Sequence, residues 1–215
     1  MRRQTFTEQS VDYGAIGATT DPDLMRYPPE GFKPAEHRIK LGSGDERFER
    51  SADALMTWGI QRGAHLQVTD VQEGTGEQYL GIVYDDEGHP LEQQPADRSE
   101  QRFTADGTPY VAAGMTATIA RRRGLPRYRA QMLVVYVIDE PDRVGFAYGT
   151  VSGGPLSGEE SFVVERREDD SVWLTIRAFH RPAGPWSRFF GGIVRRQRRE
   201  VVRDELRALH PAGAV

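Results

Sequence analysis

The chain has 215 residues, a net charge of −4 and no cysteine. This length is sufficient to bury a substantial core, and a chain without cysteine has neither disulfides nor thiolate-ligated metals. The acidic balance gives no general cationic field to attract nucleic acid, and no apolar run approaches the roughly 20 residues that cross a bilayer. We therefore expect a cytoplasmic protein that neither spans a membrane nor binds nucleic acid.

The N-terminal part of the chain predicts an irregular segment followed by a strand and a helix. Four prolines stand among glycines and charged side chains in residues 1–36, which is typical of irregular structure lying over a core. A short strand is expected at residues 37–41. Ser43, with Glu46 three positions later, matches a capping box at a helix start. An apolar stripe at helical spacing then predicts a helix near residues 44–62.

An acidic insert occupies roughly residues 70–125. Alternation typical of strands is expected near its start, at residues 65–71 and 77–85, and again at residues 109–120. The excess of acidic side chains predicts a solvated region, and the sequence does not indicate its role.

The second half of the chain predicts an antiparallel sheet and one long helix. Strand-like segments separated by short turn signals occupy residues 131–139, 144–151, 158–166 and 171–180. Strands joined by short turns are antiparallel, because a parallel connection needs a crossover of about a dozen residues. An amphipathic helix from Pro185 to about Leu209 follows the last strand. The expected fold class is α+β, with a curved antiparallel sheet wrapped around a long C-terminal helix (a helix-grip arrangement) in a single domain spanning residues 1–215.

His180 is the most suggestive polar residue. Strand alternation places it on the face of Ile176 and Ala178, which is expected to lie beneath the helix. An even-length hairpin loop sets Glu159 opposite His180, whereas an odd one brings Glu160 near it, and a one-residue slip exchanges the two faces. A carboxylate beside an imidazole favours the imidazolium or supplies a general acid–base pair. The alternative is a structural ion pair at a strand end.

The space between sheet and helix is expected to hold a ligand. Gln197 lies in the middle of the apolar stripe of the helix, either as a pocket contact or as a core amide. Candidate ligand-binding side chains are Tyr136, Phe146, Tyr148, Phe162, Ile176, Phe190, Val194 and Gln197. The arginines beside this stripe are expected on a solvated exterior with local ion pairs; the alternative is a basic face for phosphate or anionic lipid.

Motifs that would indicate a metal or a nucleotide cofactor are missing from the sequence. The five histidines show no metal-ligand spacing. The chain also has no phosphate-binding glycine loop and no serine nucleophile elbow. We expect no metal and no cofactor.

Several segments resemble domain-of-unknown-function family nineteen-ninety, which is uncharacterised. The resemblance rests on YGAIGATT at residues 13–20, LGSGDERFERSADALMTW at 41–58, residues 134–165, and residues 172–186 leading into the final helix. Two positions depart from the family pattern, since Gly154 stands where His is usual and His180 where Ser is usual. His180 is therefore a local feature of this chain.

The order of elements is also similar to the START and polyketide-cyclase-like helix-grip superfamily. That resemblance implies an apolar ligand held between helix and sheet, and in some members an enzyme. The first hypothesis is binding of a hydrophobic small molecule, such as a lipid or a polyketide-like metabolite. The alternatives are a cyclase- or dehydratase-type enzyme that uses His180 and a glutamate, and an interaction module without a cavity. Ligand identity and oligomeric state are not determined by the sequence.

Overall fold

A computed structural model describes residues 10–74, 103–104, 107–121, 127–184 and 189–210. The elements are, in chain order, the 3-10 helix η2 (Ala18–Thr20), β1 (Lys33–Ser43), α1 (Asp45–Met56), α2 (Gly59–Gly63), β2 (Gln67–Gln72), β3 (Thr116–Arg121), β4 (Tyr128–Glu140), β5 (Arg143–Ser152), β6 (Leu156–Arg166), β7 (Ser171–Pro182) and α4 (Gly191–Ala208).

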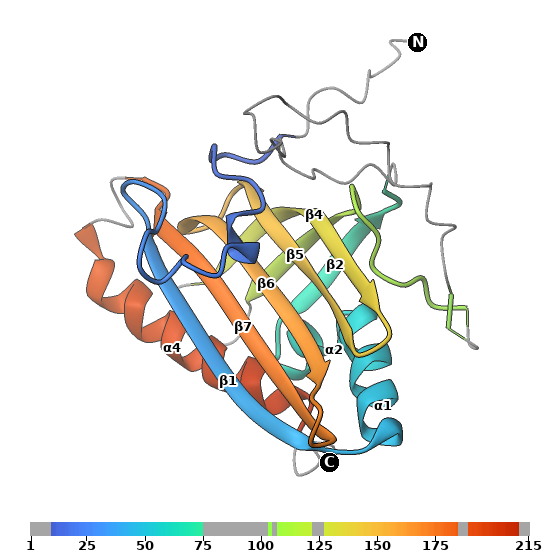
Figure 1. Ribbon diagram of the computed structural model, residues 1–215. Helices are drawn as coiled ribbons and strands as arrows, with labels where there is room; N and C mark the ends of the chain where they lie inside the picture. The colour runs from blue at the N-terminus through green and yellow to red at the C-terminus, as the bar shows by residue number, and fades with distance from the viewer. Residues whose placement is uncertain (1–9, 75–102, 105–106, 122–126, 185–188, 211–215) are drawn as a thin grey trace, which may run out of the picture.

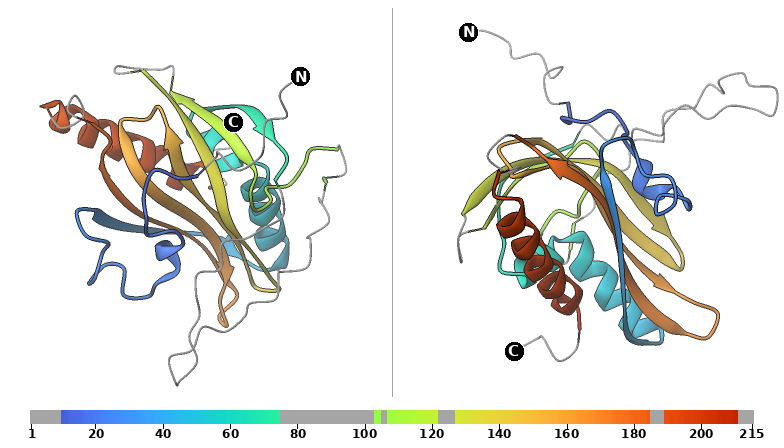
Figure 2. Two further views of the ribbon diagram at one scale, coloured as in Figure 1. Left: turned by 90° about the horizontal axis from the view of Figure 1, so that it is seen from above. Right: turned by 90° about the vertical axis from the view of Figure 1, so that its left-hand side faces the viewer.

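Seven strands form one curved sheet in the order β1-β7-β6-β5-β4-β3-β2 (Figure 1). Every neighbouring pair is antiparallel. Strands β4 to β7 are successive hairpins, as their short turns predict. The helices α1, α2 and α4 lie on the concave face, while η2 and the segment around it cover part of the opposite, convex face (Figure 2). The predicted fold class, an α+β helix-grip, is confirmed.

The first predicted helix is divided in two. Trp58 lies between α1 and α2 with a φ of 63°, and this left-handed conformation interrupts the helix. The expected capping box does not form, because Ser43 still belongs to β1. The N-cap is instead Gly44, whose φ of 88° suits a residue without a Cβ atom.

The acidic insert is described only at its two ends. Its first strand is β2, and the strand predicted from residue 109 begins only at Thr116, as β3. The strand predicted at residues 77–85 lies outside the described residues.

The sheet carries an apolar cluster on each face. The larger one fills the space between the concave face and the helices, where the Trp58 ring contacts the rings of Phe146 and Tyr148. The smaller one lies on the convex face, where Tyr13 and Phe32 pack against Phe179. The N-terminal irregular segment therefore covers a second core, as its sequence predicts.

The terminal helix α4 packs closely against α2 and crosses β1 and β7. A Cβ atom added to Gly63 would lie 2.7 Å from the Cβ of Ala208, so only glycine permits this approach. In the part of the chain that the structure describes, no helix is long and apolar enough to cross a membrane.

Candidate functional site

A cavity of about 70 Å³ lies between α4 and the concave face of the sheet. Apolar side chains such as Ile119, Met132 and Val201 form most of its wall. A wider groove of about 490 Å³ adjoins it between α4 and the sheet edge, where β1 begins and β7 ends. Both spaces are lined by Leu156, His180, Val194 and Arg198, so these residues stand at their junction.

Most of the predicted ligand-binding side chains lie on the concave face. Tyr148, Val194 and Gln197 line the cavity, and Gln197 is buried, so α4 presents this side chain to the sheet. Three others belong to the core on that face rather than to the cavity wall: Phe146, Phe162 and Ile176.

Phe190 does not line the cavity. Its side chain is 44% exposed, and Ile193 is 50% exposed. The buried line of α4 is centred on Val194, and at 100° per residue Arg198 and Glu205 fall within about 40° of that centre. Phe190 is the N-cap residue of α4, so its exposed side chain lies at the end of the helix, before the residues that pack on the sheet.

Tyr136 lies on the convex face and not in the cavity. The register of β4 with β5 shifts between Val134 and Tyr136, and such an irregularity changes the face to which the following side chains point. The hydroxyl group of Tyr136 lies 2.7 Å from Thr19 Oγ1.

The hairpin register decides between the two glutamates. His180 pairs with Gly158, so Glu160 shares the face of His180 whereas Glu159 points to the opposite face. Both ring nitrogens of His180 are buried and have no hydrogen-bond partner among the described residues. Burial lowers the pKa of His180 to about 4. The imidazole is therefore neutral near pH 7, and the expected pairing of a carboxylate with an imidazolium does not form.

The charged group of the cavity is instead a triad that sequence reasoning missed. Arg198 forms ion pairs with Glu160 and with Glu205, the latter at 3.1 Å between Nη1 and Oε2. Tyr148 donates a hydrogen bond to Glu160 at 3.2 Å. Burial raises the pKa of Glu205, and the guanidinium of Arg198 partly offsets this effect. We expected Arg198 on a solvated exterior with local ion pairs. Its partner Glu205 is buried instead, because it follows Val201 by four residues and so shares the same helix face.

On the convex face, Glu159 holds the N-terminal segment. Its buried carboxylate accepts hydrogen bonds from Tyr13 Oη (2.8 Å), the backbone N–H groups of Gly17 (2.7 Å) and Thr19 (3.0 Å), and Thr19 Oγ1 (2.5 Å). Because the Thr19 hydroxyl proton goes to Glu159, the nearby Tyr136 hydroxyl donates to Thr19 Oγ1. We name this arrangement the Glu159 clasp.

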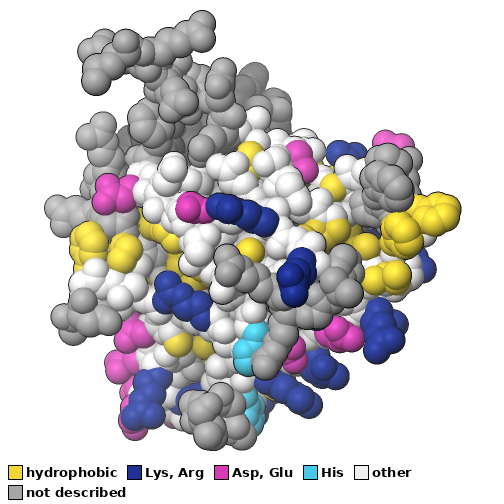
Figure 3. Space-filling model, turned by 180° about the vertical axis from the view of Figure 1, so that it is seen from behind, with side chains coloured by type: hydrophobic (Ala, Val, Ile, Leu, Met, Phe, Trp, Pro, Cys, Tyr) yellow, Lys and Arg dark blue, Asp and Glu magenta, His cyan; other side chains and the backbone are white. Residues whose placement is uncertain are grey.

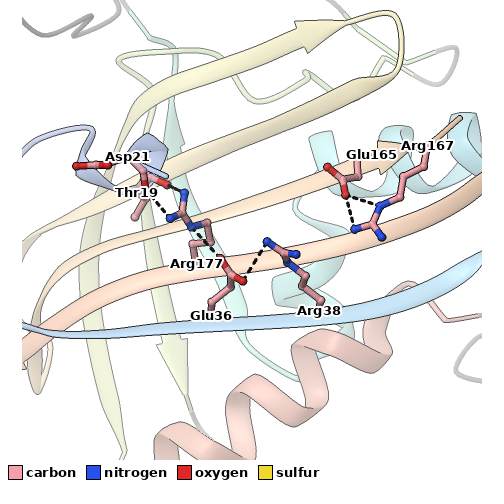
Figure 4. A network of polar contacts seen from close by, with 7 residues as sticks. All are labelled: Thr19, Asp21, Glu36, Arg38, Glu165, Arg167 and Arg177. Atoms are coloured by element: carbon pink, nitrogen blue, oxygen red, sulfur yellow. Dashed lines mark hydrogen bonds and ion pairs between the residues drawn. The ribbon is translucent and has the colours of Figure 1, made fainter. Parts of the chain in front are cut away.

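Two further contacts fix the same segment. Arg177 of β7 donates a hydrogen bond to the Thr19 carbonyl group at 2.9 Å and pairs with Glu36 of β1 at 3.2 Å (Figure 4). A Cβ atom at Gly149 would lie 2.1 Å from the Tyr13 hydroxyl oxygen, so glycine leaves room for that ring. Glu159 therefore has a structural role on the convex face, away from the cavity.

A family model described as Domain of unknown function (DUF1990) matches residues 12–85 and 91–208. The chain belongs to the DUF1990 family. A UPF0548 protein of Deinococcus radiodurans is 30% identical over 205 residues, which cover 95% of this chain and 90% of that protein. A UPF0548 protein of Arabidopsis thaliana is 26% identical over 160 residues, or 72% of this chain and 60% of that protein.

Solved structures show similarity at the level of the fold alone. A hypothetical protein from Helicobacter pylori aligns with a TM-score of 0.50 and 9% identity, over 99% of each chain. A norcoclaurine synthase mutant from Thalictrum flavum aligns with a TM-score of 0.42 and 10% identity, over 83% of this chain and 94% of that one.

In this DUF1990 chain, two of the segments that carry the family resemblance meet at the clasp. The segment at residues 13–20 supplies all four donors to Glu159, which belongs to the segment at 134–165. Among the described residues, no group of three His, Asp or Glu side chains is placed to hold a metal ion.

The depressed pKa of His180 predicts a pH dependence of stability. The unfolded chain has a His pKa of about 6.5, and the folded value is about 4, so the unfolded state binds more protons between these values. The contribution of His180 to the free energy of unfolding is therefore fully present above about pH 6.5, and it is lost as the pH falls toward 4. Urea unfolding of the wild type should lose about 2 kcal/mol more between pH 7 and pH 5 than His180→Asn loses.

The exposed His65 supplies the control for this measurement. His65→Asn suits the positive φ at that position and should retain the wild-type slope. Equal slopes for the wild type and His180→Asn would refute the prediction.

Proposed function

We propose that this protein binds a hydrophobic small molecule, of the lipid or polyketide-like class, between α4 and the concave face of the sheet. The observation that carries the proposal is His180, whose two ring nitrogens are buried without a partner among the described residues, at the junction of cavity and groove. A buried polar group without a partner costs about 1–3 kcal/mol. A ligand that exchanges a hydrogen bond with His180 would recover part of that cost.

The size and character of the two spaces support the same proposal. The groove volume of about 490 Å³ lies within the roughly 300–1,000 Å³ typical of ligand sites. Most of the wall is apolar, and the polar groups His180, Gln197 and Arg198 gather around the cavity. An apolar wall with a few placed polar groups is the usual composition of a small-molecule site.

The direct test is a substitution that fills the site with a larger side chain. Val194 is buried and lines both cavity and groove, whereas its neighbour Ile193 is half exposed. N-phenyl-1-naphthylamine, a neutral apolar probe that fluoresces on leaving water, should bind the wild type and Ile193→Trp with similar affinity. Val194→Trp should weaken the affinity by about tenfold or more, because the indole occupies the volume of the ligand. Equal binding by the two tryptophan variants, both checked for folding by circular dichroism, would refute the proposal.

A second candidate function is an acid–base enzyme of the cyclase or dehydratase type in the same cavity. It is supported by the neutral His180 and the carboxylate of Glu160, which line one cavity from neighbouring strands. A neutral imidazole is competent as a general base. Native mass spectrometry of gently purified protein would identify a bound ligand. Incubation of that ligand with wild type and His180→Gln would then test turnover, and conversion by both proteins at equal rates would exclude His180 as the base.

A further inference from the structure

The groove beside α4 combines an apolar floor with a basic rim. The floor is formed by Pro34, Ala35, Leu156, Val194, Val202 and Leu206. The rim consists of Lys33 and Arg181 at the sheet edge and of Arg195, Arg199 and Arg203 on the helix. The three helix arginines follow at intervals of four residues, so they form one row along α4. Two rows of cations therefore face each other across apolar surface.

The positive charge of the rim is not balanced within the groove. No Asp or Glu is present among the described residues that line it. Other arginines of α4 do form ion pairs: Arg196 contacts Glu200 at 3.3 Å, Arg198 contacts two glutamates, and Arg203 of the rim contacts Asp204 at 3.6 Å. Arg195 and Arg199 form no ion pair with a described residue. The view from behind shows Lys and Arg side chains at several places on this face, with Asp and Glu side chains among them (Figure 3).

A cluster of cations on one face of an acidic chain favours binding of an anion at that face. The chain carries a net charge of −4, so the rim is a local excess and not a general property. Unpaired like charges repel one another, and an anion in the groove relieves that repulsion. The apolar floor contributes in another way, because it gains about 25 cal/mol for each Å² of apolar surface removed from water.

We infer that the groove selects an anionic amphiphile, with its apolar chain on the floor and its carboxylate or phosphate headgroup against Lys33, Arg195 and Arg199. The inference rests on the proposed function and adds the charge of the ligand. His180 lies where the floor meets the cavity. It is thus placed to contact the ligand at the inner end of the groove.

The test compares ligands with one chain and different heads. Isothermal titration calorimetry below the micelle concentration would use decanoate, decyl phosphate, decanol and decyltrimethylammonium, with inorganic phosphate as a headgroup without a chain. The affinities for decanoate and decyl phosphate should be higher than that for decanol by about tenfold or more. Two exposed charge contacts together contribute roughly that factor. Decyltrimethylammonium should bind more weakly than decanol, and inorganic phosphate should show no saturable binding. Added salt should weaken the two anions only.

Two double variants test which arginines of α4 contact the headgroup. Arg195→Gln/Arg199→Gln should lower decanoate affinity by about tenfold and leave decanol within about twofold. Arg196→Gln/Arg207→Gln removes the same charge from the same helix, but neither residue lines the groove. That control should bind decanoate as the wild type does. Equal losses in both double variants would overturn the assignment to the rim.

The remaining outcomes separate this inference from the proposed function. Equal affinity for decanoate and decanol would overturn the anionic selectivity and leave hydrophobic binding intact. Inorganic phosphate that binds as tightly as decyl phosphate would overturn the amphiphile and leave a simple anion site. Failure of every chain-bearing ligand to bind would overturn both proposals.

Discussion

Glu159→Gln should lower the free energy of unfolding by about 2–4 kcal/mol, because it disrupts a buried carboxylate whose hydrogen bonds to a charged acceptor contribute about 1.5–3 kcal/mol each. The four groups that contact Glu159 are all donors. A glutamine amide must direct its NH2 group at two of them, so at least one buried donor loses its partner. The loss should appear in urea unfolding at pH 7.

The same change should release the N-terminal segment before the sheet unfolds. Amide hydrogen exchange should accelerate around Gly17 and Thr19, while the amides of β6 and β7 retain their protection. Glu165→Gln is the matched control, since Glu165 lies on the same strand but is half-buried, and its one ion-pair partner among the described residues is Arg167. A Glu159→Gln protein within about 0.5 kcal/mol of the control would show that the clasp does not stabilise the fold.

Arg198→Met should be at least as damaging, with a loss of about 3–5 kcal/mol at pH 7. Arg198 is the cation between Glu160 and Glu205, both of which are buried. Its removal leaves two carboxylates without a counter-charge, and the pKa of Glu205, already raised by burial, should rise further. The penalty should therefore shrink as the pH falls and the carboxylates take up protons.

Two variants make this prediction specific. Arg196→Met removes an arginine from the same helix at a site that is 80% exposed, and it should change stability by less than about 0.5 kcal/mol. The triple variant Arg198→Met/Glu160→Gln/Glu205→Gln should recover much of the loss, because no buried charge remains. If the triple variant were no more stable than Arg198→Met alone, the ion pairs would not be the cause.

The fold was predictable from local signals that tertiary context did not override. Short turns between alternating segments fix antiparallel hairpins, so β4 to β7 follow directly from the sequence. The stripe of α4 predicts correctly that Val194 and Gln197 face the sheet. The split between α1 and α2 was not predictable, because the left-handed Trp58 lies inside a continuous apolar stripe.

The site was less predictable because it depends on register and on pairing between distant residues. A one-residue change in the β6–β7 hairpin would exchange the roles of Glu159 and Glu160, and the turn sequence alone does not fix it. The register shift in β4 moves Tyr136 to the other face. Arg198 and Glu205 resemble ordinary charges of a solvated helix until the strand that carries Glu160 is placed beside them.

Binding of an apolar ligand between α4 and the sheet underlies the proposed function. The most direct test is an NMR titration of the wild-type protein with N-phenyl-1-naphthylamine, followed through backbone amide shifts. Saturable shifts should occur at Val194, Gln197 and Val201 of α4 and at His180 of β7, which line the cavity. Shifts confined to the amides of Phe189, Phe190 and Ile193, whose side chains are exposed, or no saturable shift at all, would rule out binding in this space.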